Sequence, residues 1–359
     1  MPLSCHAVDR IAADHIATSR LKRGCKGRDT RSMSRDAVIV ADNNYVAHGA
    51  VALFSLAENN PDESIRAFVV LTEDVSADSR RHLAKLSRLP NLDVQIIDRF
   101  RIDNDKYGFR LFGHYTIATF YRLFFQHILP DDVSQILYLD CDTIVNKSLT
   151  ELFNINLGSH FFAAVEDFCL TPDHYCKDLL MPAGAPYCNA GVMLINMNKW
   201  REENALDLFV DTNQRLMNQP VWVDQDLINA TLFDRWLPLS PAYNFQTNGF
   251  ESYRHAYFRK HNKEYPTGYL TFSLRERDEA AERPHVIHYT VHRPWEPDNA
   301  HPFRETYWSY RKRIPIRKSW GENRLVHSAK RLLLAPLRAI KRAVPQPIRP
   351  FLKKAFGKS

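Results

Sequence analysis

The sequence lacks long apolar runs and any regular arrangement of cysteines. No uninterrupted apolar stretch approaches the roughly 18 residues that a membrane-spanning helix needs, and residues 1–35 lack the apolar core of a secretory signal peptide. The six cysteines form no Cys-x-x-Cys pair; they are Cys5, Cys25, Cys141, Cys169, Cys176 and Cys188. These absences argue against a membrane span, secretion and a disulfide scaffold, so we expect a cytoplasmic protein with reduced thiols.

Acidic residues are scarce at both ends of the chain and frequent between them. Residues 311–359 hold 15 Lys and Arg against a single acidic residue, and residues 1–35 hold 8 against 3. Residues 36–310 carry 25 basic and 37 acidic side chains, so the net charge of +7 comes from the two ends. We expect a basic, poorly ordered N-terminal extension over residues 1–35, a folded domain over 36–308 and a basic tail over 309–359.

The basic tail has the pattern of an amphipathic helix. Its apolar face consists of Val326, Ala329, Leu333, Leu337, Ile340 and Val344. The basic arc beside this face consists of Lys330, Arg331, Arg338, Lys341 and Arg342. Such a helix, kinked at Pro336, is attracted to anionic lipid, whereas nucleic acid is not expected as a partner because few aromatic side chains could stack on bases. We therefore predict peripheral association with the inner face of the plasma membrane, with a solvated tail as the alternative.

From residue 36 onward, short apolar runs alternate with amphipathic stretches. The runs at 37–41, 65–71, 92–97, 135–139, 161–165 and 191–197 predict strands, and the stretches at 46–56, 76–87, 116–128 and 225–233 predict helices. Taken in chain order, the first five of these elements, at residues 37–97, form a βαβαβ unit. This unit predicts an α/β fold with a parallel, nucleotide-binding type of sheet. Asp224 is expected to cap the last helix and to leave Gln225 and Asp226 in an exposed first turn.

Two aspartates, Asp140 and Asp142, follow the apolar run Gln135–Leu139. Alternate side chains of a strand share a face, so both carboxylates can point the same way at the carboxyl end, where open α/β sheets bind ligands. Because neighbouring carboxylates repel each other unless a cation lies between them, the pair indicates a hard-metal site for a metal-bound diphosphate. An acidic turn after a strand is the simpler interpretation of an isolated Asp-x-Asp.

Four stretches of the sequence together carry a family pattern. They are Val40–Tyr45 after the first strand, Leu139–Asp142, Asn189–Asn196, and Asp224–Asp226 followed by Ile287–Tyr289. In order and spacing they resemble glycosyltransferase family 8, the retaining GT-A enzymes that use nucleotide sugars, over about residues 38–295. The resemblance implies a Rossmann-like mixed central sheet flanked by helices, with a basic helical C-terminal extension. It also implies a metal-dependent hexosyltransferase that uses UDP-glucose or UDP-galactose as donor.

The resemblance makes Asp140, Asp142 and His288 the metal ligands. His288 is one of 15 histidines and is singled out only by the family pattern. Carboxylate oxygens and an imidazole nitrogen suit Mn²⁺, with Mg²⁺ as the alternative cofactor. A cation at this position would stabilise the negative charge of the departing diphosphate.

The resemblance also implies which residues hold the nucleotide sugar. Uridine and ribose would bind to Ala41, Asp42, Asn44 and Tyr45, and the phosphates and sugar to Arg122, Asn189 and Ala190. Val291 and Arg293 stand where family members often have a glycine and a lysine, and an arginine can still bind phosphate. Without the family pattern, Asp42 would be assigned to a capped turn and Arg122 to a helix surface.

Asp224, Gln225 and Asp226 match the catalytic-face segment of the family. The resemblance implies that Asp224 binds sugar hydroxyls and that Gln225 lies beneath the anomeric carbon. Retention of configuration requires either a covalent intermediate or attack from the leaving-group side. The uncharged Gln225 is a poor nucleophile and Asp226 a better one if the geometry permits. We favour same-face attack with the diphosphate as base, and the covalent route stays open.

The acceptor is expected to be a saccharide, with bacterial lipopolysaccharide core or another lipid-linked glycan suited to a membrane-associated enzyme. The polar segment Asp98–His114 is long enough to contact it. Two other classes compete. The stretch Leu137–Thr143 also matches the nucleophile motif of haloacid-dehalogenase-like phosphatases, but it follows three strands and no Gly-Asp dipeptide occurs. A catalytically silent sugar-nucleotide-binding scaffold is disfavoured because both aspartates, His288 and the Asp224–Asp226 segment are all present.

Overall fold

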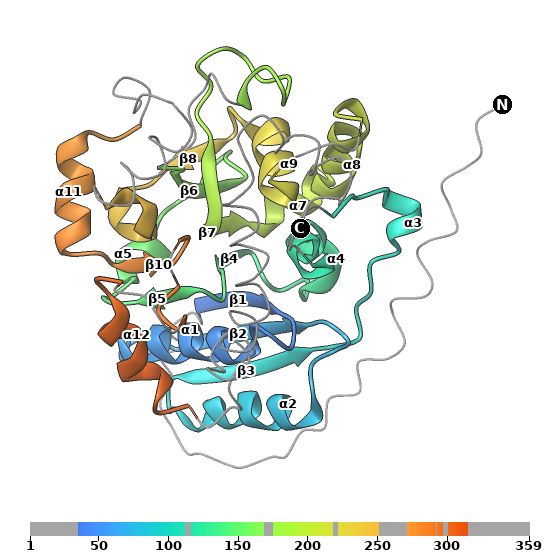
Figure 1. Ribbon diagram of the computed structural model, residues 1–359. Coiled ribbons are helices and arrows are strands. Elements are labelled where there is room, and N and C mark those ends of the chain that lie inside the picture. Colours follow the sequence, from blue (N-terminus) through green and yellow to red (C-terminus); the bar gives the residue numbers. More distant parts are fainter. Residues whose placement is uncertain are drawn as a thin grey trace, which may run out of the picture. The chain divides into compact units, whose positions relative to one another are not determined.

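The computed structural model describes most of the predicted domain. The described residues are 35–111, 116–168, 175–217, 222–250, 271–291, 293–296 and 301–314 (Figure 1), and all lie within one compact unit. The predicted N-terminal extension, apart from Arg35, and the predicted amphipathic helix at 326–344 lie outside them. Within the described part, no helix is both long and apolar enough to cross a membrane.

A seven-stranded mixed sheet forms the centre of the structure, with the strand order β3-β2-β1-β4-β7-β6-β8. Its strands are β1 (Arg35–Ala41), β2 (Ile65–Leu71), β3 (Leu92–Ile97), β4 (Gln135–Leu139), β6 (Phe162–Glu166), β7 (Cys188–Asn196) and β8 (Trp236–Pro238). Only β7 runs antiparallel to its neighbours, β4 and β6. The three strands of the predicted βαβαβ unit, β1 to β3, are parallel as expected. The sheet as a whole is mixed, which confirms the GT-A type of architecture.

Helices pack on both faces of this sheet, and a smaller sheet adjoins it. The helices are α1 (Val46–Glu58), α2 (Ala77–Ala84), η1 (Lys85–Arg88), α3 (Asn104–Tyr107), η2 (Ile117–Phe124), α4 (Phe125–Ile128), α5 (Thr150–Phe153), α7 (Met197–Glu202), α8 (Ala205–Arg215), α9 (Val223–Leu232), η3 (Pro241–Asn244), η4 (Thr247–Gly249), α11 (Leu274–Glu282) and α12 (Arg304–Arg311). The small sheet has the order β5 (Thr143–Val145), β10 (Val286–His288), β9 (Phe245–Gln246). In this small sheet, β10 pairs with β5 and so lies beside the residues that follow β4.

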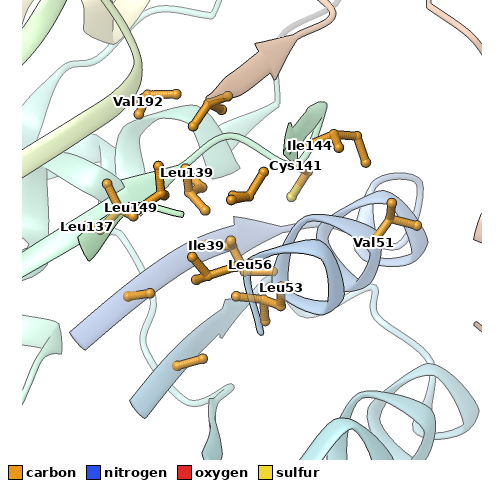
Figure 2. Close-up of a cluster of buried hydrophobic side chains, with 14 of the residues drawn as sticks. Ile39, Val51, Leu53, Leu56, Leu137, Leu139, Cys141, Ile144, Leu149 and Val192 are labelled. Atoms are coloured by element: carbon orange, nitrogen blue, oxygen red, sulfur yellow. The ribbon is translucent and has the colours of Figure 1, made fainter. Parts of the chain in front are cut away.

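Alternating side chains of the central strands build two separate cores. Ile39 of β1 packs with α1, α2 and α12 on one face, whereas Val38 packs with η2, α4, α7, α8 and α9 on the other. Figure 2 shows Leu53 and Leu56 of α1 against Ile39 in the first core. Burial on both faces explains why these strands read as continuous apolar runs in the sequence.

The predicted helix at 116–128 is only partly α-helical. Residues Ile117–Phe124 form a 3₁₀ helix, and α-helix follows over α4 alone. In a 3₁₀ helix, residues three apart lie on the same side. Thr116, which caps this helix, Thr119 and Arg122 therefore lie along one line, and all three bind aspartates of the site described below. Tertiary bonding to these aspartates accounts for the tighter winding.

The end of the described chain packs on α1. Helix α12 lies beside α1 (Figure 1) and continues to Arg311, and Ile314 beyond it is buried. Arg313 pairs with Glu58 at the end of α1. The packed residues thus continue beyond position 308, where the charge pattern predicts the domain to end.

Candidate active site

Asp140, Asp142 and His288 converge at the carboxyl edge of β4. One ligand atom from each lies within 4.8 Å of the others. His288 Nε2 is 3.7 Å from Asp140 Oδ2 and 3.4 Å from Asp142 Oδ1. Cys141, between the two aspartates, faces the core and α1 (Figure 2), so both flanking carboxylates face the opposite side. Two carboxylates and one imidazole form a donor set that suits a divalent cation.

Each of these three side chains is held by a partner that leaves one ligand atom directed at the cluster. Asp140 Oδ1 accepts hydrogen bonds from Arg122 Nη2 at 2.9 Å and from the Tyr138 hydroxyl, so Oδ2 faces His288. The other ring nitrogen of His288, Nδ1, lies 3.0 Å from Asn244 Oδ1. Because an amide oxygen accepts hydrogen bonds, Nδ1 donates, and a neutral ring would present its Nε2 lone pair to a cation at the cluster.

The cluster strongly favours positive charge. Burial lowers the pKa of His288, but the hydrogen bond and charge of Asp142 and the charge of Asp140 together raise it above its ordinary value. Burial raises the pKa of Asp142, yet His288 and Arg293 outweigh that effect and hold the pKa well below the usual range. A cation can therefore be bound here without first ionising the Asp142 carboxyl group.

Gly191 of β7 lies directly against Asp140 and His288. Its carbonyl oxygen accepts a hydrogen bond of 2.7 Å from Asp140 N. A Cβ atom at this position would lie 2.1 Å from His288 Cε1 and 2.8 Å from Asp140 Oδ2. Only glycine allows β7 and the His288 ring to approach each other this closely.

Arg122 joins Asp140 to β7 and to the start of α9. Its buried guanidinium donates to Ala190 O at 2.6 Å, and its Nε lies 2.7 Å from Asp224 Oδ2. Burial lowers its pKa, but the charges of Asp140 and Asp224 raise it overall, so Arg122 stays charged. The sequence alone favours an exposed helix charge at this position, and the structure instead gives a buried cation between two carboxylates.

The start of α9 differs from the predicted capped, exposed turn. Trp222 is the cap residue, and Asp224 and Asp226 lie inside the helix with exposed fractions of only 3% and 2%. Thr119 Oγ1 donates to Asp224 Oδ1 at 2.5 Å. Asp226 accepts from the Tyr187 hydroxyl and from Trp222 N, both at 2.6 Å. The prediction was wrong because Asp224 pairs with the distant Arg122 instead of capping its own helix.

Gln225 is turned toward β7, the strand that carries Asn189 and Ala190. Its Oε1 accepts from Ala190 N at 3.0 Å, and its Nε2 donates to Asp167 Oδ2 at 3.4 Å. Asn189 Nδ2 donates to the same oxygen at 3.0 Å. Asp167 is a residue of this cluster that the sequence pattern does not single out. Its position two residues after the predicted strand 161–165, at the same edge as Asp140, was the available signal.

The turn after β1 lies at the other end of the site. Asp42 Oδ1 accepts from Asn44 N and Tyr45 N, both at 2.9 Å, and burial raises the pKa of this carboxyl group. Asp42 therefore does shape the strand-to-helix turn, whatever else it binds. Ala41 is buried, Asn44 is exposed, and the guanidinium of Arg293 lies 5.8 Å from the centre of the Tyr45 ring. Arg293 Nε is 3.7 Å from an Asp142 oxygen, which links this turn to the metal ligands.

The described part of the predicted acceptor segment packs against η2. The Tyr121 hydroxyl donates to Phe100 O at 3.2 Å, and Phe109 stacks on Phe120 with 4.7 Å between ring centres. The last residues of this segment, 112–114, lie outside the described part of the chain. The segment thus adjoins the helix that carries Arg122.

Comparison with known proteins agrees with this arrangement. The model of the family "Glycosyl transferase family 8" matches residues 37–299. General stress protein A of Bacillus subtilis is 25% identical over 278 residues, which cover 76% of this chain and 91% of that protein. Glycosyltransferase GlyB of Streptococcus pneumoniae is 31% identical over 280 residues, 77% of this chain and 61% of GlyB. The crystal structure of galactosyltransferase LgtC with donor and acceptor sugar analogs has a TM-score of 0.66 at 26% identity, covering 79% of this chain and 98% of LgtC.

Glu166, which precedes Asp167, predicts a pH dependence of stability. It is buried, Thr271 N donates to its Oε2 at 2.5 Å, and burial raises its pKa from 4.5 to about 7. Between these two values the folded protein keeps a proton that the unfolded chain has released, so stability falls as pH rises through this window. Glu166→Gln should remove this contribution and be more stable relative to the native protein at pH 8 than at pH 5, as guanidinium unfolding would show. An equal difference at both pH values would contradict the assignment.

Gly191 predicts a steric control of metal binding. Gly191→Ala should displace His288 and weaken Mn²⁺ binding about 10- to 100-fold, the range found when groups that orient metal ligands are changed. Titration followed by electron paramagnetic resonance of free Mn²⁺ measures this directly. Val192→Ala, at the next position of β7, removes core packing from the opposite face and serves as the control for lost stability. An unchanged Mn²⁺ affinity in Gly191→Ala would rule out this geometry.

Proposed function

Because the chain belongs to glycosyltransferase family 8, we propose that it transfers glucose or galactose from a UDP-sugar to a saccharide acceptor with retention of configuration. The observation that carries this proposal is the convergence of Asp140, Asp142 and His288. Within the same network, Arg122 connects these ligands to the Asn189–Ala190 strand and to the α9 segment that holds Gln225.

The three ligands fit a divalent cation, and the imidazole favours Mn²⁺ over Mg²⁺. When bound, the cation would act as a Lewis acid on the diphosphate leaving group. The protein's own contribution is to orient the atoms that would bind the cation before the cation and the nucleotide are present. Asn244 orients His288, while Arg122 and Tyr138 orient Asp140, so little reorganisation is needed when charge develops.

The remaining cationic and polar groups suit the nucleotide. Asp42, Asn44 and Tyr45, at the end of β1 with Ala41, are proposed to hold the uridine and ribose. Arg293 lies between Tyr45 and Asp142, which is where the diphosphate must pass from the nucleoside to the metal ligands. A guanidinium at this point can form two parallel hydrogen bonds with phosphate oxygens.

The sugar would lie between Arg122, the Asn189–Ala190 strand and Gln225. We propose that the acceptor hydroxyl oxygen bonds to the anomeric carbon from the side on which the bond to the diphosphate breaks. Its proton passes to a diphosphate oxygen. Both oxygens of Asp226 accept hydrogen bonds inside the protein, so we assign Asp226 to holding the α9 start and not to nucleophilic attack. Gln225, bonded to Ala190 and Asp167, is assigned to positioning the sugar.

The acceptor is proposed to be lipid-linked, with lipopolysaccharide core as the leading candidate. The galactosyltransferase LgtC, a structural relative, was crystallised with donor and acceptor sugar analogs, which supports a saccharide acceptor. The chain also carries a strongly basic C-terminal stretch that suits an anionic membrane surface.

The activity can be tested by UDP release from a panel of UDP-sugars with and without Mn²⁺. Release should depend on Mn²⁺, favour one UDP-hexose and be lost in Asp142→Asn, because this change removes a ligand charge. Asp93→Asn, an exposed aspartate on β3, should behave like the native protein. If the native protein neither releases UDP nor binds it in the presence of Mn²⁺, the transferase proposal is wrong.

Membrane association can be tested by sedimentation with vesicles. The full chain should bind vesicles of anionic phosphatidylglycerol more tightly than neutral phosphatidylcholine vesicles. Lys330→Ala combined with Arg331→Ala should weaken anionic binding about 30-fold, from about 1 kcal/mol for each charge near the surface. A matched double variant, Arg81→Ala with Arg275→Ala, removes two exposed charges elsewhere and should have no effect. Equal binding to both vesicle types would refute membrane association through the tail.

A further inference from the structure

Helix α12 holds the loop that follows the metal ligand His288. The Tyr289 hydroxyl donates to Phe303 O at 2.9 Å, and Trp308 Nε1 donates to Pro294 O at 3.1 Å. Arg304 also donates to the Pro294 carbonyl. These bonds hold the Tyr289 side chain before Arg293 and the Pro294 carbonyl after it. The position of α12 is thereby tied to that of a residue proposed to bind the diphosphate.

Trp295 connects this loop to α1. It is 5% exposed, and its ring stacks on His48 of α1 with 3.8 Å between ring centres and 24° between planes. On α12, the Tyr307 ring lies 5.1 Å from Trp295, and the Tyr307 hydroxyl is hydrogen-bonded to His48 Nδ1 at 2.6 Å. We refer to Tyr307, His48 and Trp295 as the aromatic stack. It joins α12, α1 and the loop in one buried contact.

The aromatic stack borders the residues proposed to bind the nucleotide. Tyr45 contacts the edges of both His48 and Trp295, with ring centres 5.6 and 6.5 Å apart. Arg293, two residues before Trp295, also lies over the Tyr45 ring, with its guanidinium carbon 5.8 Å from the ring centre. Movement of Trp295 would therefore shift Arg293 and Tyr45 relative to each other, and with them the distance between the nucleoside turn and the metal ligands.

His48 of α1 is a polar side chain in an otherwise apolar core. His48 is 2% exposed and lies in a core of apolar side chains, where burying a polar ring is costly unless it is hydrogen-bonded. A leucine or phenylalanine would fill similar space without fixing the angle of the ring. The bond to Tyr307 fixes that angle, and the fixed ring gives Trp295 one preferred orientation.

We propose that the aromatic stack is a positioning element for the donor site. By setting the position of Trp295, the Tyr307 hydroxyl holds Arg293 and Tyr45 at the separation that the diphosphate of UDP requires. This inference rests on the proposed function, because it assumes that a uridine diphosphate occupies this site. None of the three stacked residues is assigned a contact with the reacting atoms.

The chain offers a matched pair of variants for the test. Tyr307→Phe removes the hydroxyl bonded to His48, whereas Tyr310→Phe removes the hydroxyl that accepts from Asn59 Nδ2 at 2.8 Å. Both tyrosines lie on α12 and both bonds join it to the α1 region. Each variant deletes one oxygen, and loss of a single hydrogen bond has a similar effect on stability in either place. Only Tyr307 belongs to the aromatic stack.

The measurement is calorimetric binding of UDP in the presence of Mn²⁺ to the full-length native protein and both variants, with guanidinium unfolding as the stability control. Tyr307→Phe should weaken UDP binding about fivefold, the equivalent of about one hydrogen bond, and Tyr310→Phe should leave it unchanged. In turnover, Tyr307→Phe should raise KM for the UDP-sugar with little change in kcat, because uniform binding is lost.

The outcomes separate the inference from the function on which it rests. If the native protein binds UDP and both variants bind it equally well, the positioning role is wrong while the proposed function stands. If both variants lose affinity in proportion to their lost stability, the effect is structural and the inference is again refuted. A native protein that binds no UDP with Mn²⁺ would overturn the proposed function and the inference together.

Discussion

Mutual repulsion among aspartates at one edge of the sheet is the constraint on which the site depends. Asp140, Asp142 and Asp224 are largely buried, where isolated charges would cost several kcal/mol each. Arg122 lies between Asp140 and Asp224, and His288 lies against Asp142. The elements that carry these partners, η2 and β10, must therefore reach this edge from distant parts of the sequence. The small sheet places His288 near the end of β4, because β10 pairs there with β5.

The positive partners can reach these aspartates because neighbouring backbone segments approach closely at Gly49 of α1 and Gly191 of β7. Cys141 takes the core-facing position between the two aspartates, and Gly49 of α1 leaves room for its sulfur, which would lie 2.9 Å from a Cβ atom there. Gly191 provides the corresponding space on the ligand side. The 3₁₀ winding of η2 adds a third device, because it places Thr119 and Arg122 on one side, so that both bind Asp224. The same few residues therefore provide both the close packing and the pairing of the buried carboxylates.

The sequence was most informative where a feature is local. The runs at 65–71 and 92–97 coincide with β2 and β3. Strand β2 is buried on both faces, which favours a nearly continuous apolar run, whereas β3 lies at the edge of the sheet and includes the exposed Asp93. The Asp-x-Asp pair could also be placed at a strand end from alternation alone. The antiparallel course of β7 could not be predicted, because it depends on partners far apart in the chain. Nor could the burial of Asp224, since its partner Arg122 lies on another element, and that ion pair overrides the local capping preference.

The start of α9 shows how such long-range contacts override local preference. Val223 has a φ of +50°, a left-handed conformation that a β-branched residue rarely adopts and that costs about 1–3 kcal/mol. Asp226 binds the backbone of Trp222 on one side of it, and Asp224 binds Thr119 on the other. Hydrogen bonds to charged groups contribute about 1.5–3 kcal/mol each, so together they outweigh the strain. The direction of the Gln225 side chain is therefore set by the hydrogen bonds of its two buried neighbours, Asp224 and Asp226.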